Sequence, residues 1–233
     1  MDINKSLTYI TEDEQWITKF IIGAVLALFS IFIIPGFFLA GYTVRLTRNV
    51  MDGVEQPLPE WTDWGGLFME GLYIFIAMFV YSLPFVLVVC CSVLFIAMAG
   101  GAEGSGAEDL IAGLGALGMF LVACLSMIWA VLLLVVAPVV FIQFARTGEL
   151  SACFQFSEIM ALTRENIGDI LLTVLVIFGV SFVLGFLGII PIIGVILSLA
   201  ARIYVGFVTG HLYGQLGAKM YGGKAKDFET GLT

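Results

Sequence analysis

The sequence predicts an all-α integral membrane protein, a bundle of about five hydrophobic helical segments with one or two interfacial amphipathic helices. Hydrophobic residues make up 61% of the 233 residues, and the mean hydropathy is +1.08. The apolar residues form long continuous runs, and a helix needs about 20 such residues to cross the ~30 Å hydrocarbon core of a bilayer. These runs lack the alternation of lipid-facing β-strands, so helices, which satisfy their backbone polar groups internally, are expected.

Five segments meet this length requirement and define a polytopic membrane domain over residues 16–219. Their approximate bounds are 16–44, 67–99, 110–144, 167–187 and 192–216. Residues 1–15 precede them as an amphipathic segment expected at the membrane interface, and residues 220–233 follow as a tail expected in the cytoplasm.

Pro35 interrupts the first segment near its middle. Proline lacks an N–H donor and clashes with the preceding turn, so the break either kinks a single crossing or turns the chain back as a hairpin. A single crossing places Met1 outside, and a hairpin places it inside. An approximate repeat favours the hairpin, because residues 7–36 and 154–194 each contain a polar lead-in, an apolar run and a break rich in Ile, Pro and Gly.

Residues 148–166 are expected to form an interfacial helix, with a plain connector as the alternative. Helical spacing puts four apolar residues on one face, namely Leu150, Phe154, Ile159 and Leu162. The polar residues Glu149, Ser157, Glu158 and Arg164 remain for the solvent side. This pattern is typical of a helix that lies in the plane of the membrane surface.

The orientation follows from Lys and Arg near the helix ends, which favour the cytoplasm. Such residues follow the first segment, separate the third from the fourth and follow the fifth: Arg45, Arg48, Arg146, Arg164, Lys219, Lys224 and Lys226. The connections over residues 100–109 and 188–191 contain none. We therefore expect the basic ends and the C-terminus in the cytoplasm and the connection at 101–109 outside.

The turn after the first segment contains six distinctive residues, Pro57, Pro59, Glu60, Trp61, Asp63 and Trp64. The prolines stiffen the turn, the tryptophans suit the lipid headgroup region, and the carboxylates remain solvated beside them. The turn either anchors the start of the second segment or forms a docking surface for a partner or a lipid headgroup.

A longer string of residues around this turn resembles a known family. It comprises Gly41-Tyr42, Arg45, Arg48-Asn49-Val50, Asp52-Gly53, Pro57-Leu58-Pro59-Glu60-Trp61, Asp63-Trp64 and Gly71, with Tyr9, Glu12-Asp13-Glu14, Trp16 and Gly23 before it. The string resembles the uncharacterised multi-pass membrane family called domain of unknown function 4013, found in archaea and bacteria. This resemblance implies a multi-pass protein of a prokaryotic cytoplasmic (inner) membrane, and it implies no activity, ligand or catalytic residue.

Arg202 is the only Lys or Arg well inside a predicted span. A charge near the bilayer centre costs roughly 2.5–3.5 kcal/mol on insertion scales, and such residues usually face the bundle interior and find a partner. Three roles are open: a bridge to another helix, contact with an anionic substrate, and snorkelling to the surface. The candidates for a bridging partner are Glu70, Gln143 and Asp169.

Three small residues, Gly206, Gly210 and Gly214, follow Arg202 at four-residue spacing. Such a ridge lets a second helix approach closely, within the chain, from another copy or, as the remaining alternative, along a narrow pore. His211 is the sole histidine, and with Gln215 one turn away it is expected to be a hydrogen-bonded interfacial residue.

Several function classes lack support in the sequence. The net charge of −8 and the absence of a basic stripe argue against nucleic acid. One histidine and four cysteines without CxxC spacing do not suggest a metal or haem site. Catalytic signatures such as HExxH, GxSxG and the phosphate-binding GxxxxGK are missing. We expect no cofactor and no enzymatic activity.

The favoured function is therefore that of a non-enzymatic accessory or scaffold subunit that packs against other membrane components. The turn at 57–64, the helix at 148–166 and the ridge at 206–214 are its expected contact surfaces. The alternative is a small transporter or lipid-handling protein in which Arg202 contacts an anionic group. The expected partners are membrane lipids and other membrane proteins or a second copy of the chain, whereas the substrate, the partner's identity and the oligomeric state stay open.

Overall fold

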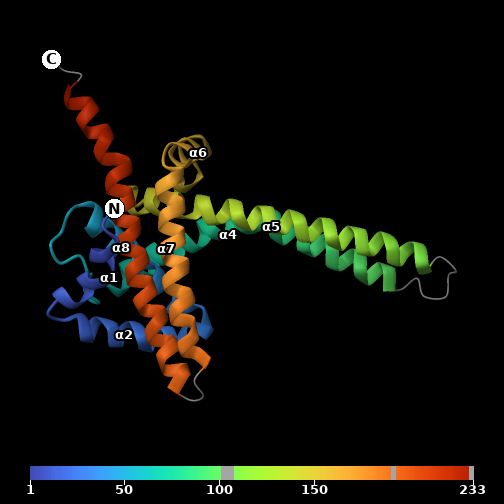
Figure 1. Cartoon of the computed structure of the whole chain (residues 1–233), viewed down its shortest axis with the longest axis horizontal. Coiled ribbons are helices and arrows are strands. Elements are labelled where there is room, and N and C mark those ends of the chain that lie inside the picture. The colour runs from blue at the N-terminus through green and yellow to red at the C-terminus, as the bar shows by residue number, and fades with distance from the viewer. Residues whose placement is uncertain (101–107, 190–192, 231–233) are drawn as a thin grey trace. The chain divides into compact units, whose positions relative to one another are not determined.

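The fold was analysed in a computed structural model, which describes residues 1–100, 108–189 and 193–230 (Figure 1). These residues form α-helices and short 3-10 turns, and no β-strand occurs among them. The predicted all-α class is confirmed. Most of the connection expected outside, residues 101–107, and the break at 190–192 lie beyond the described ranges.

The elements follow one another as α1 (Ile3–Thr8), η1 (Tyr9–Glu12), α2 (Trp16–Leu28), η2 (Phe29–Phe32), α3 (Ile34–Met51), α4 (Trp64–Gly100), α5 (Glu108–Thr147), η3 (Leu150–Phe154), α6 (Phe156–Glu165), α7 (Ile167–Gly185), η4 (Phe186–Ile189) and α8 (Ile193–Thr230). The described residues hold four stretches long and apolar enough to cross a membrane: Trp64–Val93, Leu117–Thr147, Ile167–Ile189 and Ile193–Gly222. The helical segments Ile3–Glu12 and Trp16–Phe32 form a pair that bends by 102° at its break. If this pair is one span, the described residues hold up to five candidate membrane spans.

The chain divides into two compact units. The main unit consists of Met1–Ala77 with Val135–Thr233, and the second unit is Met78–Leu134. In the second unit, α4 and α5 form an antiparallel pair around an apolar groove, in which the Trp129 indole donates a hydrogen bond of 3.2 Å to the Tyr81 carbonyl. The candidate site described below belongs to the main unit.

The first predicted segment, 16–44, is broken into two helices that fold back on one another. The break lies at Ile33, which has a φ of +64°, a backbone conformation that a β-branched residue rarely adopts. Helix α2 runs antiparallel to α8, because Gly23 faces Ile203 and Phe20 meets Phe207. This stretch therefore has the form of a hairpin.

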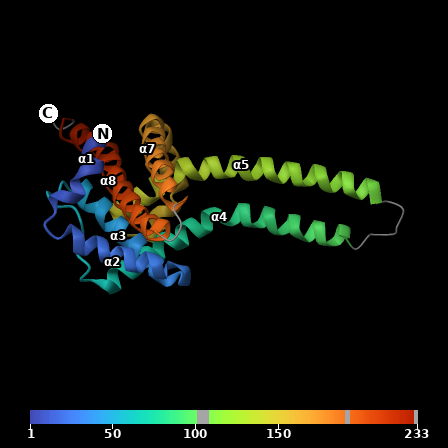
Figure 2. The same ribbon diagram turned by 60° about the horizontal axis from the view of Figure 1, so that its bottom comes forward.

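Helix α3 returns parallel to α8, and the two pack along most of α3 (Figure 2). The register is set by glycines, since a Cβ at Gly210 would lie 2.8 Å from the Leu46 side chain and one at Gly214 would lie 2.4 Å from that of Val50. The Thr47 hydroxyl adds a hydrogen bond of 3.2 Å to the Gly210 carbonyl. Small residues on α8 thus allow the close approach of α3.

Helices α3 and α4 cross in the opposite direction and approach still more closely. A Cβ at Gly41 would lie 1.9 Å from the Leu67 carbonyl oxygen, and one at Gly71 would lie 1.8 Å from that of Phe37. Only glycine fits at either position.

The N-terminal segment packs onto the far half of α8. The Ser6 hydroxyl lies 2.9 Å from His211 Nδ1, and the Tyr9 ring stacks on the His211 ring with centroids 4.2 Å apart. The Asp2 backbone N–H donates to the Gln215 side chain at 2.7 Å. His211 has the hydrogen-bonded role expected for it, and Met1 lies at the same end of the main unit as the C-terminal half of α8.

Two predicted boundaries differ from the observed ones. The interfacial stretch 148–166 consists of η3 and α6, in which Ile159 and Leu162 are buried and Phe156 and Met160 are exposed. Helix α8 continues to Thr230, beyond the predicted end at 216, because Gly217 packs against α3 and α5 and no proline interrupts the following residues.

Candidate functional site

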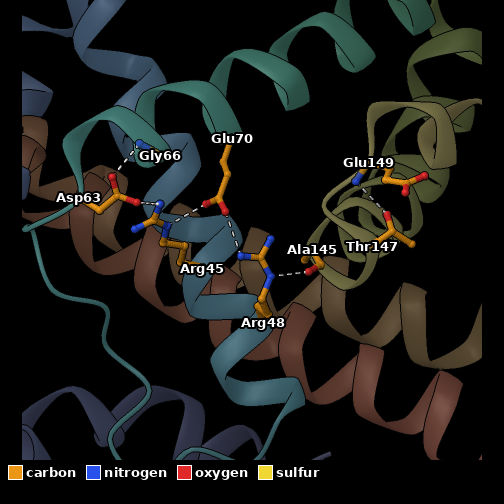
Figure 3. Close-up of polar contacts among 8 residues, drawn as sticks. All are labelled: Arg45, Arg48, Asp63, Gly66, Glu70, Ala145, Thr147 and Glu149. Atoms are coloured by element: carbon orange, nitrogen blue, oxygen red, sulfur yellow. Dashed lines mark hydrogen bonds and ion pairs between the residues drawn. The ribbon is translucent and has the colours of Figure 1, made fainter.

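A chain of ion pairs joins the starts and ends of three helices (Figure 3). The Glu70 carboxylate on α4 accepts from Arg45 Nε and from Arg48 Nη1, each at 2.9 Å, and both arginines belong to α3. Arg45 also reaches Asp63 at 2.6 Å, and Arg48 Nε donates to the Ala145 carbonyl near the end of α5 at 2.7 Å. Charge is balanced within this network, so its chemistry is that of a structural clamp.

Asp63 caps the start of α4. Its carboxylate accepts from the Gly66 backbone N–H at 3.0 Å and from Arg45. These hydrogen bonds favour the charged form, the backbone one most strongly, and lower the pKa of Asp63 below its ordinary value of 3.8.

The turn predicted as an anchor or a docking surface makes many contacts within the chain. Trp61 is buried, stacks on Tyr42 at a centroid distance of 4.3 Å and donates from its indole to the Lys19 carbonyl at 3.1 Å. Glu60 pairs with the Lys19 ammonium at 2.6 Å. Pro57 and Pro59 are buried, and Trp64 is 42% exposed while it stacks on Trp61. These contacts within the chain are those that an anchor needs, and Glu60, Asp63 and Trp64 also remain exposed.

The Lys19 ammonium is the centre of a buried cluster that sequence reasoning missed. It contacts Asp13 at 2.8 Å, Glu60 and the Leu58 carbonyl at 3.0 Å. Asp13 and Lys19 are six residues apart, which is not the spacing of a helical ion pair. The sequence therefore contains no local pattern that predicts this cluster.

The glycine ridge divides into two parts. Gly210 and Gly214 are occupied by α3, whereas a Cβ at Gly206 would meet nothing within 4 Å. Gly36 on α3 is open in the same way. The ridge is therefore a packing surface within the chain at two positions and borders open space at the third.

That open space is a cavity of about 240 Å³ between α3 and α8. Nine residues line it: Gly36, Leu39, Ala40, Tyr42, Thr43, Arg202, Ile203, Gly206 and Phe207. Three of the lining positions are Gly or Ala, and they provide the room that larger side chains would fill. Most of the lining is apolar, and Arg202 is the only charged residue among the described residues that form it.

Arg202 is exposed, and among the described residues nothing forms an ion pair or hydrogen bond with it. The three partners suggested by the sequence are engaged elsewhere. Glu70 binds Arg45 and Arg48, Asp169 binds Lys219 at 2.6 Å, and Gln143 accepts from the Tyr221 hydroxyl. Within the described residues, the charge of Arg202 is therefore uncompensated.

Tyr42 is a second lining residue with an unused polar group. It is 1% exposed, held between the Trp61 and Phe207 rings, and its hydroxyl has no hydrogen-bond partner in the described structure. Buried polar groups are nearly always hydrogen-bonded, so this enclosed hydroxyl is an exception to that rule.

The depth of this cavity follows from the helical rise. Arg202 lies about 14 Å along α8 from Ile193, and the polar contacts at Gln215 lie about 20 Å further on, at 1.5 Å per residue. The cavity is thus well inside the apolar stretch of α8. Among the described residues, no group of three His, Cys, Asp or Glu could hold a metal ion.

These features define the class: a polytopic α-helical membrane protein with a small cavity and, inside its apolar region, an arginine that has no ion-pair partner in the described ranges. A family model described as "Protein of unknown function (DUF4013)" matches residues 25–193, and the chain belongs to this family. The match includes the turn and the α3–α4 contact but ends before Arg202. No curated protein and no solved structure matches this chain at a significant level.

Proposed function

We propose that the protein is a non-enzymatic lipid-handling protein of a prokaryotic cytoplasmic membrane. Supporting this, α2–η2–α3 and α7–η4–α8 are two helical hairpins with the same order of helix, 3-10 turn and helix. Their second helices, α3 and α8, pack in parallel and leave the cavity between them. Repeated halves with broken helices commonly place a substrate site at their interface, and this cavity at the repeat interface is the observation that carries the proposal.

The proposal concerns lipids because the cavity has few polar groups. An ion or a sugar needs several polar partners to replace water, and one arginine among apolar side chains cannot supply them. An amphiphile needs only a partner for its head, since its chains remain in the bilayer. This is the second of the two functions that the sequence left open.

The orientation proposed from the sequence has structural support. Arg45 and Arg48 lie toward the end of α3, Arg146 stacks on Tyr221 near the end of α8, and Lys219 pairs with Asp169. These basic residues gather at one end of the main unit, which the charge rule assigns to the cytoplasm. Because α1 packs at this end too, the proposal places both termini in the cytoplasm.

Extraction of the tagged protein from its native membrane into lipid discs, with mass spectrometry of everything that co-purifies, tests the function. A defined lipid enriched at a fixed ratio to the chain, over a protein purified in parallel from the same membrane, is the expected result. Co-purification of bulk lipid alone, in the proportions of the membrane, would argue against lipid handling.

The accessory function remains the second candidate, and the α4–α5 pair favours it. Within Leu117–Thr147, the most apolar window has no buried residue in the part of the chain that the structure describes, and such an apolar surface suits contact with another membrane protein. A protein partner at fixed stoichiometry in the same experiment, without an enriched lipid, would replace the lipid-handling proposal by the accessory one.

A further inference from the structure

We infer that the cavity between α3 and α8 binds the singly charged oxyanion head of an amphiphile, with the Arg202 guanidinium as its counter-ion. This inference rests on the proposed function and names the chemistry of its ligand. It is independent of the ion-pair network around Glu70, which is balanced within the chain.

The charge of Arg202 favours an anionic ligand. A guanidinium in an apolar region is unfavourable unless a partner compensates it, and the described residues contain none. The planar guanidinium presents paired N–H donors that match a carboxylate or a phosphate. An anionic ligand is therefore the group that would complete this site.

The number of charges limits the ligand to one negative charge. No other lining residue of the cavity carries a positive charge. A phosphomonoester, with nearly two charges, would leave one uncompensated inside the apolar region. A carboxylate or a phosphodiester, with a single charge, is balanced by Arg202 alone.

The size of the cavity limits what enters it. Sites that enclose a whole small-molecule ligand measure about 300–1,000 Å³, whereas this cavity is about 240 Å³. It therefore accommodates a head group, and the apolar chains stay among the lipids. Leu39, Ile203 and Phe207 provide apolar contact for the first carbons of such a chain.

The Thr43 hydroxyl is a further polar group among the lining residues of the cavity. This hydroxyl donates to the Leu39 carbonyl at 2.9 Å. The Thr43 oxygen keeps lone pairs that can accept from a hydroxyl-bearing head group. The site thus suits an oxyanion with a neighbouring hydroxyl, as well as a simple carboxylate.

The test measures lipid binding by native mass spectrometry of the full chain in detergent micelles doped with one lipid at a time. The probes are oleate for a carboxylate, phosphatidylglycerol for a phosphodiester with hydroxyls, and phosphatidylcholine as the lipid with no net charge. Inorganic phosphate without lipid is the soluble-anion probe. We expect at least one of the two anionic amphiphiles to bind tenfold more tightly than phosphatidylcholine, and the stronger one identifies the source of the oxyanion.

Two variants perturb the site in different ways. Arg202→Leu removes the charge and is expected to lower binding of the preferred anionic amphiphile at least tenfold. Arg202→Lys keeps the charge but lacks the paired guanidinium donors, so its affinity should lie between those of the unaltered protein and Arg202→Leu. Gly206→Leu fills the cavity from a position with open space around it and is expected to lower binding by a similar factor while the charge remains.

Matched controls separate this site from general effects. Arg164→Leu removes an exposed charge on α6, and Gly179→Leu adds the same side chain at an exposed, open position on α7. Both are expected to bind like the unaltered protein. Thermal unfolding of every variant checks that the chain is folded, and Gly206→Leu still tests the site if Arg202→Leu fails this check.

If the folded Arg202→Leu and Gly206→Leu variants bound the anionic amphiphile as tightly as the unaltered protein does, the inference would be overturned. A preference for phosphatidylcholine would overturn it too, as would Arg202-dependent binding of inorganic phosphate in place of the amphiphiles. If a defined lipid still co-purified from the native membrane while these variants bound normally, the lipid-handling function would stand and only this site would be wrong.

Discussion

The Gly71→Ala substitution tests the close contact between α3 and α4. The added Cβ would lie 1.8 Å from the Phe37 carbonyl oxygen and 2.6 Å from its carbonyl carbon. Both atoms belong to the backbone of a helix, so no side chain can rotate away. The two helices would have to separate by more than about 1 Å to restore ordinary contact distances.

The magnitude follows from two opposing effects. Overpacking a close contact costs about 1–3 kcal/mol, and a backbone clash belongs at the upper end of that range. Alanine in place of glycine within a helix returns about 0.5–1 kcal/mol. The net loss is about 2 kcal/mol, which lowers the midpoint of thermal unfolding by roughly 4–8 °C for a chain of this size.

The assay is thermal unfolding in detergent, followed by tryptophan fluorescence and by the monodisperse fraction in size-exclusion chromatography. Gly65→Ala is the matched control, because Gly65 also lies in the first turns of α4 and has nothing within 4 Å of the new Cβ. It should melt at the same temperature as the unaltered protein or slightly above. Equal midpoints for Gly71→Ala and Gly65→Ala would refute the close approach of α3 and α4.

Three further predictions concern the clamp and the turn. Glu70→Gln should lower the free energy of unfolding by about 1–2 kcal/mol, because two arginines lose their shared carboxylate. Its melting midpoint should lie below that of the control Glu55→Gln, which changes an exposed loop residue. Equal midpoints would contradict the clamp. Trp61→Phe should lower the free energy of unfolding by about 1–2 kcal/mol, because the hydrogen bond to Lys19 is lost. Trp61→Ala should lower it by about 3–5 kcal/mol, because the missing indole leaves a void in the core. Unchanged melting midpoints would favour a docking surface over an anchor. The lowered pKa of Asp63 means that its stabilising effect is present above pH 4 and is lost as the pH falls further, so Asp63→Asn should flatten the decline of the melting midpoint below pH 4; parallel pH curves for the two proteins would be the contrary result.

The hydrophobic segments were predictable because each depends on its own residues. The predicted span 167–187 became α7 with η4, ending at Ile189, and the predicted span 67–99 became most of α4. The break at Pro35 was visible for the same reason, since proline acts on the turn that precedes it. The chain breaks at Ile33, two residues earlier, and the fold-back that follows could be left only as one of two alternatives.

The candidate site was only half predictable. Arg202 stood out because a charge inside an apolar run is a local property, but none of its three suggested partners contacts it. Each of the three binds another side chain that is distant in the sequence but close in the fold. Asp169, for example, pairs with Lys219. Tyr42 drew attention only as part of the family string, because its burial and its orphaned hydroxyl depend on rings from two other segments.

The sequence by itself determined the membrane class, the helical segments and the family, because the transfer of apolar residues into lipid depends on composition along one stretch of chain. It also singled out the residues with unusual properties, Arg202, the glycine ridge and the turn at 57–64. The tertiary structure decided what those residues contact: the turn packs on Lys19 and Tyr42, Gly210 and Gly214 receive α3, and Gly206 borders the cavity at Arg202. Pairing and open space depend on which distant segments meet and in what register, and hydropathy contains no information about either.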